Sequence, residues 1–311
     1  MAPQGPLELH HHPEPHQHRE TQRRCGDPRA EAAFRWSIAL NSGLTVLQLV
    51  IGVAFGSLAL IGDALHNLGD VVGLVLGWGA ERLSLRPARG RFTYGYGRST
   101  QMAPLINGVL ICAAGGVVVV EAVERLLQPI PLIPGPVAWA AAAGIAVNLA
   151  SARLFGHHHH DLNQRAAVLH LLTDAAVSVA VLISALLVGL TGWVWLDALT
   201  ALAVGAAVIG SALGLLREAI ALNLDAAPRH VDLVRVRQAL LSLPGVRGVE
   251  DLHVWAVSSS RTALTAHLLL EQAGPAAGAA SGDALIARAH RALAPLGISH
   301  TTLQLEQSHE H

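Results

Sequence analysis

Two segments of the sequence place a histidine and an aspartate four residues apart inside otherwise apolar runs. The segments are His66-Asn67-Leu68-Gly69-Asp70 and His170-Leu171-Leu172-Thr173-Asp174. Residues four apart in a helix lie on one face, one turn above the other. Two such faces turned toward each other would offer two imidazole nitrogens and two carboxylate oxygens, a set that suits tetrahedral Zn²⁺. We therefore predict a metal site formed by His66, Asp70, His170 and Asp174.

The spacing alone is weak evidence, because His157 and Asp161 share it in a polar segment. In the alternative interpretation, each histidine bonds the aspartate of its own helix and only holds helices together. A histidine that binds metal must be neutral, so protons compete with the metal. Histidine's ordinary pKa of about 6.5 makes this competition effective near neutral pH. A site of this kind, opened alternately to two sides of a membrane, would exchange metal for protons.

The composition indicates a membrane protein. Of 311 residues, 52% are hydrophobic and 14% are charged, whereas soluble domains average about 25% charged residues. The net charge of -1 gives no reason to expect nucleic-acid binding. Cys25 and Cys112 are the two cysteines, too few for a disulfide framework or a cysteine metal site. The polar N-terminus lacks the apolar core of a secretory signal.

Six stretches are long and apolar enough to cross the hydrocarbon core, which takes about 20 residues per helix. The expected spans are Phe34–Phe55, Ser57–Leu83, Met102–Leu126, Gly135–Leu154, Ala166–Leu190 and Trp195–Leu216. The chain thus divides into a His-rich, disordered tail (1–33), a six-helix transmembrane domain (34–217) and a C-terminal metal-binding and dimerisation domain (226–311).

The distribution of arginine predicts the orientation. The segment that follows the second span carries Arg82, Arg86, Arg89, Arg91 and Arg98, and the tail carries Arg19, Arg23, Arg24 and Arg29. The segments that follow the first and third spans carry no lysine or arginine. By the positive-inside rule, both termini and the second and fourth loops face the cytosol.

The residues after Ala226 alternate between helix and strand patterns. Val231–Leu243 and Asp283–Ala294 are predicted helices; Glu250–Val257, Thr262–Glu271 and Ser299–Glu306 are predicted strands. The order α-β-β-α-β indicates a small two-layer, ferredoxin-like α+β domain.

Four motifs give the chain a clear resemblance to the cation diffusion facilitators, in particular to their bacterial zinc-efflux branch. They are Gly56-Ser57-Leu58-Ala59-Leu60-Ile61-Gly62-Asp63-Ala64-Leu65-His66 through Asp70, Phe92-Thr93-Tyr94-Gly95-Tyr96-Gly97-Arg98, the segment His170 to Asp174, and Asp251-Leu252-His253-Val254-Trp255. The resemblance covers all but the tail. It implies a homodimeric transporter, not an enzyme, in the bacterial inner membrane. It further implies zinc export driven by protons as the counter-ion, with a transport site made by the two His/Asp pairs.

The resemblance also implies a structural or regulatory zinc site in the cytosolic domain. The matching positions are His253, His267 and Glu306, with His300 as a neighbour. His253 and His267 fall on adjacent predicted strands, which a hairpin would bring together. The alternative is that these are ordinary surface histidines. Arg82–Arg98 contains neither Asp nor His, so we predict no metal site in that loop, where some relatives have one.

Other polar residues carry smaller expectations. Asp63, one turn before His66, is expected to line the exit or to support the ligands. Asp197 is expected to cap the helix of the sixth span. The histidines of the tail and the run His157–His160 have the composition of a metal-collecting tract, or are simply solvated.

Two alternatives to a zinc transporter stay open, and a third is disfavoured. An efflux carrier of the same architecture could prefer Co²⁺, Ni²⁺ or Cd²⁺, although two imidazoles favour zinc over Cd²⁺. A membrane zinc sensor that does not transport is a second alternative. An intramembrane zinc protease would need His-Glu-x-x-His, which does not occur in this sequence.

Overall fold

The computed structural model describes residues 28–155, 162–271 and 279–307. The histidines of the tail before Pro28 and the run His157–His160, both predicted to collect metal, lie outside the described residues.

Six helices in the described ranges are long and apolar enough to cross a membrane, as predicted. They are α2 (Pro28–Phe55), α3 (Leu58–Ser84), α4 (Ser99–Leu127), α5 (Pro134–Phe155), α6 (Leu162–Thr191) and α7 (Trp195–Asn223). Most ends lie within a few residues of the predicted spans. The exceptions are α2, which begins within the predicted tail, and α7, which continues past Leu216 to Asn223.

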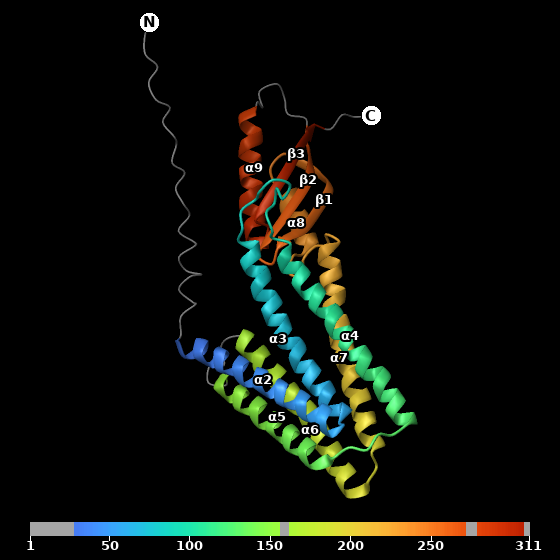
Figure 1. Ribbon diagram of the computed structural model, residues 1–311. Helices are drawn as coiled ribbons and strands as arrows, with labels where there is room; N and C mark the ends of the chain where they lie inside the picture. The colour runs from blue at the N-terminus through green and yellow to red at the C-terminus, as the bar shows by residue number, and fades with distance from the viewer. Residues whose placement is uncertain (1–27, 156–161, 272–278, 308–311) are drawn as a thin grey trace.

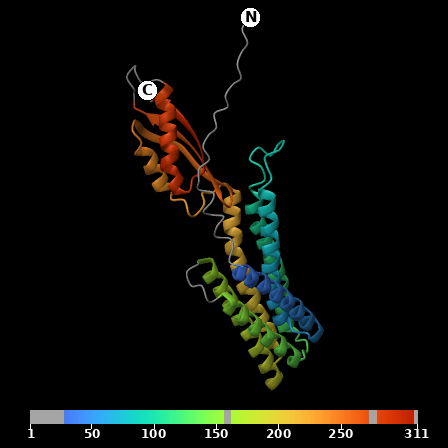
Figure 2. The same cartoon turned by 90° about the vertical axis from the view of Figure 1, so that its left-hand side faces the viewer.

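The six helices pack as two groups that meet mainly where α2 packs against α3, with α6 also in contact with α7 and α3 (Figures 1 and 2). In one group α4 lies along α7 and α3 packs against both, while in the other α5 lies along α6 and α2 packs against α5. Small residues permit this close approach. A side chain on Gly115 would meet Ile209 at 2.8 Å, and one on Gly144 would meet Ser178 Oγ at 2.8 Å.

The start of α3 is fixed by a carboxylate from α7. Gly56 turns the chain with a φ of +80°, and Ser57 caps α3 through its side chain. Asp197 accepts hydrogen bonds from Ser57 Oγ (2.6 Å) and from the backbone nitrogen of Leu58 (2.7 Å). The expectation that Asp197 caps its own helix was therefore wrong: α7 has no side-chain cap at Val194, and the carboxylate satisfies free N–H groups of α3 instead.

The C-terminal domain has the predicted α-β-β-α-β order. Its elements are α8 (Leu233–Leu241), β1 (Val246–Ser258), β2 (Arg261–Leu270), α9 (Ala279–Leu293), the short η2 (Ala294–Leu296) and β3 (His300–Gln307). The sheet order is β1-β2-β3, with β1 and β2 antiparallel and β2 and β3 parallel. A buried core joins the sheet to both helices and includes Val236, Leu240, Leu264, Leu268 and Leu293.

The end of β1 attaches this domain to the start of α4. Gln101 Nε2 donates to the carbonyl of Ala256 (2.9 Å), and the backbone nitrogen of Ser259 donates to Thr100 Oγ1 (3.0 Å). The β1–β2 turn therefore lies beside the helix bundle, where it can form part of a cavity wall.

Candidate metal centre

The two His/Asp pairs come together between α3 and α6. His66 Nε2 lies 3.2 Å from Asp174 Oδ1, and His170 Nε2 lies 3.2 Å from Asp70 Oδ2. Within each helix the distances are longer, 4.0 Å for His66–Asp70 and 3.6 Å for His170–Asp174. Each histidine is thus nearest to the aspartate of the other helix. This crossed arrangement disfavours the alternative in which each histidine only bonds its own aspartate.

The four groups are close enough to share one ion. Ligand atoms of His66, Asp70 and Asp174 lie within 4.8 Å of one another, and His170 Nε2 is within 3.6 Å of both carboxylates. Two nitrogens and two oxygens around one small volume are a suitable donor set for Zn²⁺.

The sequence left open whether the two pairs lie at the same depth, because His66 and His170 each lie eight residues past the first residue of their helix and the two helices are antiparallel. Figure 1 shows α5 and α6 displaced away from the C-terminal domain relative to α3. This offset brings the first turns of α6 level with the middle of α3. The pairs meet because of it, and α3 continues past the site toward the C-terminal domain.

The four side chains differ in exposure. The Asp174 side chain is 4% exposed and that of His66 16%, whereas Asp70 and His170 are 35% and 48% exposed. The site is therefore closed on one side and open on the other.

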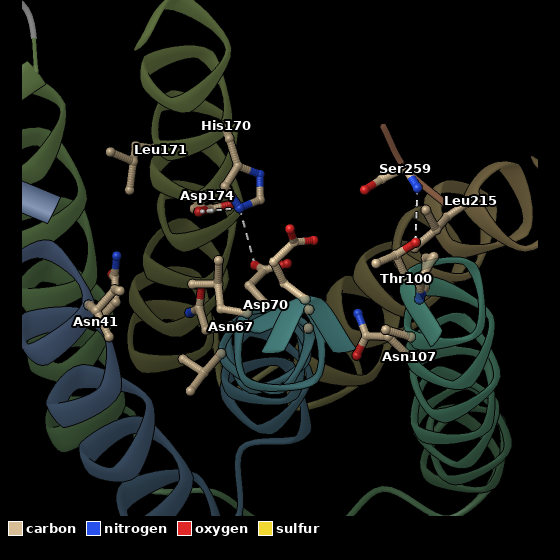
Figure 3. Close-up of a pocket in the computed structure, with 18 residues that line it drawn as sticks. Asn41, Asn67, Asp70, Thr100, Asn107, His170, Leu171, Asp174, Leu215 and Ser259 are labelled. Carbon is tan, nitrogen blue, oxygen red and sulfur yellow. Dashed lines mark hydrogen bonds and ion pairs between the residues drawn. The ribbon is translucent and has the colours of Figure 1, made fainter. Parts of the chain in front are cut away.

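The open side is a cavity of about 610 Å³. Asp70, His170 and Asp174 line one end of it, and Thr100 and Ser259 line another part, on α4 and on the β1–β2 turn (Figure 3). The cavity therefore connects the four-ligand cluster with the side of the bundle that carries the C-terminal domain.

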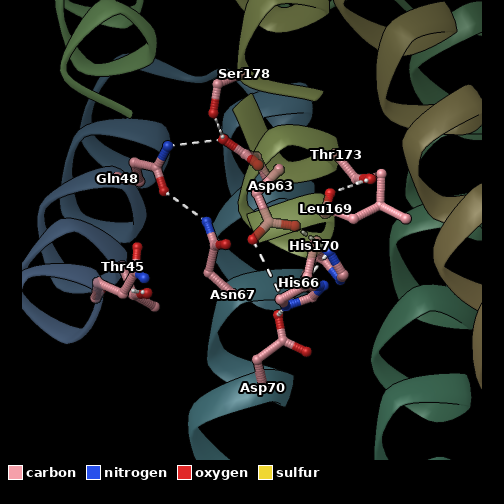
Figure 4. A network of polar contacts seen from close by, with 12 residues as sticks. Thr45, Gln48, Asp63, His66, Asn67, Asp70, Leu169, His170, Thr173 and Ser178 are labelled. Carbon is pink, nitrogen blue, oxygen red and sulfur yellow. Dashed lines mark hydrogen bonds and ion pairs between the residues drawn. The ribbon is translucent and has the colours of Figure 1, made fainter. Parts of the chain in front are cut away.

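The closed side is held by a buried polar network around Asp63. Its Oδ2 atom accepts hydrogen bonds from Gln48 Nε2 (2.7 Å) and Ser178 Oγ (2.9 Å), and Asn67 Nδ2 donates to Gln48 Oε1 at 3.2 Å (Figure 4). The network ties α2, α3 and α6 together one helical turn before His66 in the sequence. Asp63 is fully buried and is not among the residues that line the cavity. Gln48 and Ser178 were not singled out from the sequence, although a glutamine in an apolar span was a signal.

In the C-terminal domain, two of the four predicted ligands, His253 and His267, lie beside one aspartate, and a third, Glu306, contacts His267. His253 Nε2 is 2.9 Å from Asp251 Oδ1, and His267 Nε2 is 3.9 Å from Asp251 Oδ2. On the other side of its ring, His267 Nδ1 is 2.9 Å from Glu306 Oε1. The structure does not bring His300 to this group.

The ring of His300 instead faces Tyr94, with the ring centroids 6.5 Å apart. His300 begins β3, whereas Glu306 stands near its end. The two residues therefore lie at opposite ends of the strand.

Asp251 is the residue that sequence reasoning missed as a possible ligand. It lies in an irregularity of the β1–β2 ladder between the pairs Glu250–His267 and His253–Thr265, and its φ is +47°. Asp tolerates this left-handed backbone better than most residues. The bulge turns the carboxylate of Asp251 toward both histidines. The sequence pattern does not predict a bulge at this position.

Comparisons with known proteins agree over both parts of the chain. The family described as "Cation efflux transmembrane domain" matches residues 35–222, and "Cation efflux protein, cytoplasmic domain" matches residues 228–308. The cation efflux system protein CzcD of Alcaligenes sp. (strain CT14) is 32% identical over 78% of this chain and 77% of its own length. The zinc transporter ZitB of Escherichia coli (strain K12) is 32% identical over 81% and 82%. The cadmium, cobalt and zinc/H(+)-K(+) antiporter of Bacillus subtilis (strain 168) is 27% identical over 88% and 89%.

Proposed function

The chain belongs to the cation diffusion facilitator family of metal cation efflux transporters, and we propose that it exports Zn²⁺ from the cytosol in exchange for protons. The observation that carries the proposal is the crossed cluster of His66, Asp70, His170 and Asp174 at the closed end of the cavity. In this proposal the cluster is the transport site.

The choice of zinc rests on the donor set. Two imidazoles and two carboxylates are a borderline set that zinc accepts in tetrahedral form, whereas Mn²⁺ prefers oxygen alone and Cd²⁺ gains from thiolate. The name of the Escherichia coli relative specifies zinc, and that of the Bacillus subtilis relative specifies cadmium, cobalt and zinc. Transport of Co²⁺ or Cd²⁺ by the same site is the second candidate function.

The proton as counter-ion follows from ligand chemistry. His66 and His170 bind metal only as neutral imidazoles, so a proton-rich side favours release of the ion and a proton-poor side favours its binding. Their nearest carboxylates would pair with the protonated rings, at the 3.2 Å distances described above. The same four groups can therefore hold either a zinc ion or protons.

We further propose that the molecule lies in the bacterial inner membrane as a homodimer, with both termini and the 226–311 domain in the cytosol. The arginines of the loop between α3 and α4 support that orientation. The cavity beside the cluster would then open toward the cytosol, from which the cargo comes.

The C-terminal domain can hold a regulatory zinc ion only if His267 uses one of its two nitrogens. One imidazole cannot ligate a single ion through both, and its Nδ1 and Nε2 point to different carboxylates. We propose that His253, His267 and Asp251 are the ligands. Glu306 would then orient the His267 ring through Nδ1, as carboxylates commonly do behind metal-bound histidines.

The test of the transport function is metal flux into proteoliposomes that contain the full-length protein. With an imposed pH gradient, zinc should accumulate on the acidic side and protons should leave it. Competing Zn²⁺, Co²⁺, Ni²⁺ and Cd²⁺ in the same vesicles would rank the substrates. Zinc flux that ignores the pH gradient would exclude proton antiport, and zinc binding without flux would favour a sensor.

A further inference from the structure

The wall of the cavity carries a third carboxylate, which neither the ligand cluster nor the family motifs use. On α3, the residues that line the cavity include Asp70, Leu74, Gly77 and Glu81, spaced by four, three and four residues along one helix face. Glu81 therefore lies about three turns, or about 16 Å of helix rise, beyond the transport site. Glu81 is near the end of α3, and that end of the helix points toward the C-terminal domain (Figure 1).

The Glu81 carboxylate is available to a passing cation. The side chain is exposed, and no ion pair found among the described residues includes it. The adjacent Arg82 is turned away, because its guanidinium lies 4.7 Å from the ring centroid of Trp78 on another face of α3. Apart from Asp70 and Asp174 at the transport site, the other described residues along this cavity are apolar or neutral, or His170.

Glu81 does not stabilise the helix in which it lies. Glu81 lies in the last turn of α3, which ends at Ser84. A carboxylate there is unfavourable, because the carboxyl end of a helix already carries partial negative charge. That same partial charge adds to the attraction of Glu81 for a cation.

We propose that Glu81 captures the divalent cation at the mouth of the cavity and raises its concentration above the transport site. The inference rests on the proposed export function and adds the residue that controls uptake from the cytosolic side. The loop that follows α3 is rich in arginine and would otherwise repel cations. A carboxylate on the wall of a narrow cavity offsets that repulsion where the ion must pass.

The expected effect is on apparent affinity and depends on salt. A divalent cation about 8 Å from one carboxylate in water is favoured about sixfold. Screening leaves about fourfold at about 10 mM salt, where the Debye length is about 30 Å, and almost nothing at about 0.5 M. Glu81→Gln should therefore raise KM for zinc about fourfold at low salt and leave it unchanged at high salt, with the maximal flux unaltered.

The matched control is Glu124→Gln. Glu124 is also exposed on a membrane helix, but it lies in the last turn of α4, far from Thr100 and the cavity. Zinc flux would be measured in proteoliposomes at both salt concentrations for wild type, Glu81→Gln, Glu124→Gln and Asp174→Asn, together with the Tm of each. Because Glu81 is unfavourable to its helix, Glu81→Gln should keep or slightly raise the Tm.

The outcomes separate this inference from the function it rests on. A salt-dependent rise of KM in Glu81→Gln, absent from Glu124→Gln, supports the capture role. An unchanged KM at low salt overturns the capture role, and so does a loss of maximal flux at both salts together with a lower Tm. In either case an inactive Asp174→Asn leaves the proposed transport site in place. Normal zinc flux in Asp174→Asn would instead refute the proposed transport site.

Discussion

The most direct test of the transport site is the replacement of Asp174 by asparagine. Asp174 is the most buried of the four groups, and its two oxygens lie 3.2 Å from His66 and 3.6 Å from His170. Asparagine keeps the shape but removes the charge. Zinc would then be bound by one carboxylate and two imidazoles, with no charge on the buried side of the site.

The size of the effect follows from the cost of leaving a buried charge without its partner, about 3–5 kcal/mol. Since about 1.4 kcal/mol is a factor of ten, the Kd for zinc should rise by two to nearly four powers of ten. Zinc at about 100 times the wild-type Kd stabilises the wild type by about 2.7 kcal/mol. For a Kd raised 100-fold, the same zinc concentration gives only about 0.4 kcal/mol.

Thermal unfolding of the purified protein, with and without zinc, measures this difference. At about 2–4 °C per kcal/mol, the zinc-induced rise in Tm should be about 5–9 °C smaller in Asp174→Asn than in wild type. The metal-free Tm should change little, because the neighbouring carboxylate Asp70 no longer faces a like charge. Asp161→Asn, in the third His-x-x-x-Asp pair of the sequence, is the matched control and should behave as wild type.

The opposite pattern would refute the reasoning. If the cluster only holds α3 to α6, Asp174→Asn should lower the metal-free Tm by breaking two contacts, and zinc should raise the Tm of neither protein. Normal zinc flux through Asp174→Asn would lead to the same conclusion.

Three further predictions concern selectivity, the start of α3 and the C-terminal domain. His66→Asp converts the site to one nitrogen and three oxygens, so zinc loses part of the advantage that the two imidazoles give it. Competing fluxes in one vesicle preparation should then show Cd²⁺, which is larger and tolerates varied coordination, gaining on zinc; an unchanged ratio would mean that cavity size, and not the donors, sets the preference. Asp197→Asn removes one acceptor from the α3 start and should cost about 1–3 kcal/mol of stability, seen as a lower Tm with or without zinc; an unchanged Tm would make the contact with Ser57 dispensable. In the full-length protein carrying Asp174→Asn, Asp251→Asn should abolish the residual zinc binding measured by calorimetry, whereas Glu306→Gln should weaken it about 10- to 100-fold; equal losses would make Glu306 a ligand.

The helices were predictable where a long apolar run ends at a turn residue. Gly56 follows the end of α2 and Gly192 the end of α6, both with positive φ and both close to the predicted bounds. The extension of α7 to Asn223 was missed because Arg217 and Glu218 end the apolar run. The helix itself continues, since the backbone hydrogen bonds of a helix do not depend on hydrophobicity.

The partner of Asp197 shows a different limit. A carboxylate at the start of a helix signals a cap, but several helix starts lie at the same end of a bundle. Asp197 caps α3, the helix that begins 139 residues earlier, at Leu58. Only the packing of α3 against α7 decides this.

The proposed transport site was predictable as two faces but not as one cluster. The spacing His66/Asp70 and His170/Asp174 places each pair on one side of its helix, and intramembrane charge marks both pairs as functional. Their common depth depends on how far α6 slides along α3, which no local pattern encodes. The crossed contacts of 3.2 Å are likewise a product of that offset.

The same offset explains why one end of the site is open and the other closed. On the closed side, Asp63 accepts hydrogen bonds from Gln48 of α2 and Ser178 of α6, so the two helix groups are joined one turn before His66. On the open side, α3 extends past the first turns of α6, and the cavity fills the space between the two helix groups. The proposed metal ligands come from both groups, His66 on α3 and His170 on α6, so an ion bound between them would resist any separation of the groups. Opening the other side of the membrane to the site would require the Asp63 contacts to give way. In the proposed transport cycle, the two groups would therefore move relative to each other, with the four side chains near the axis of that movement.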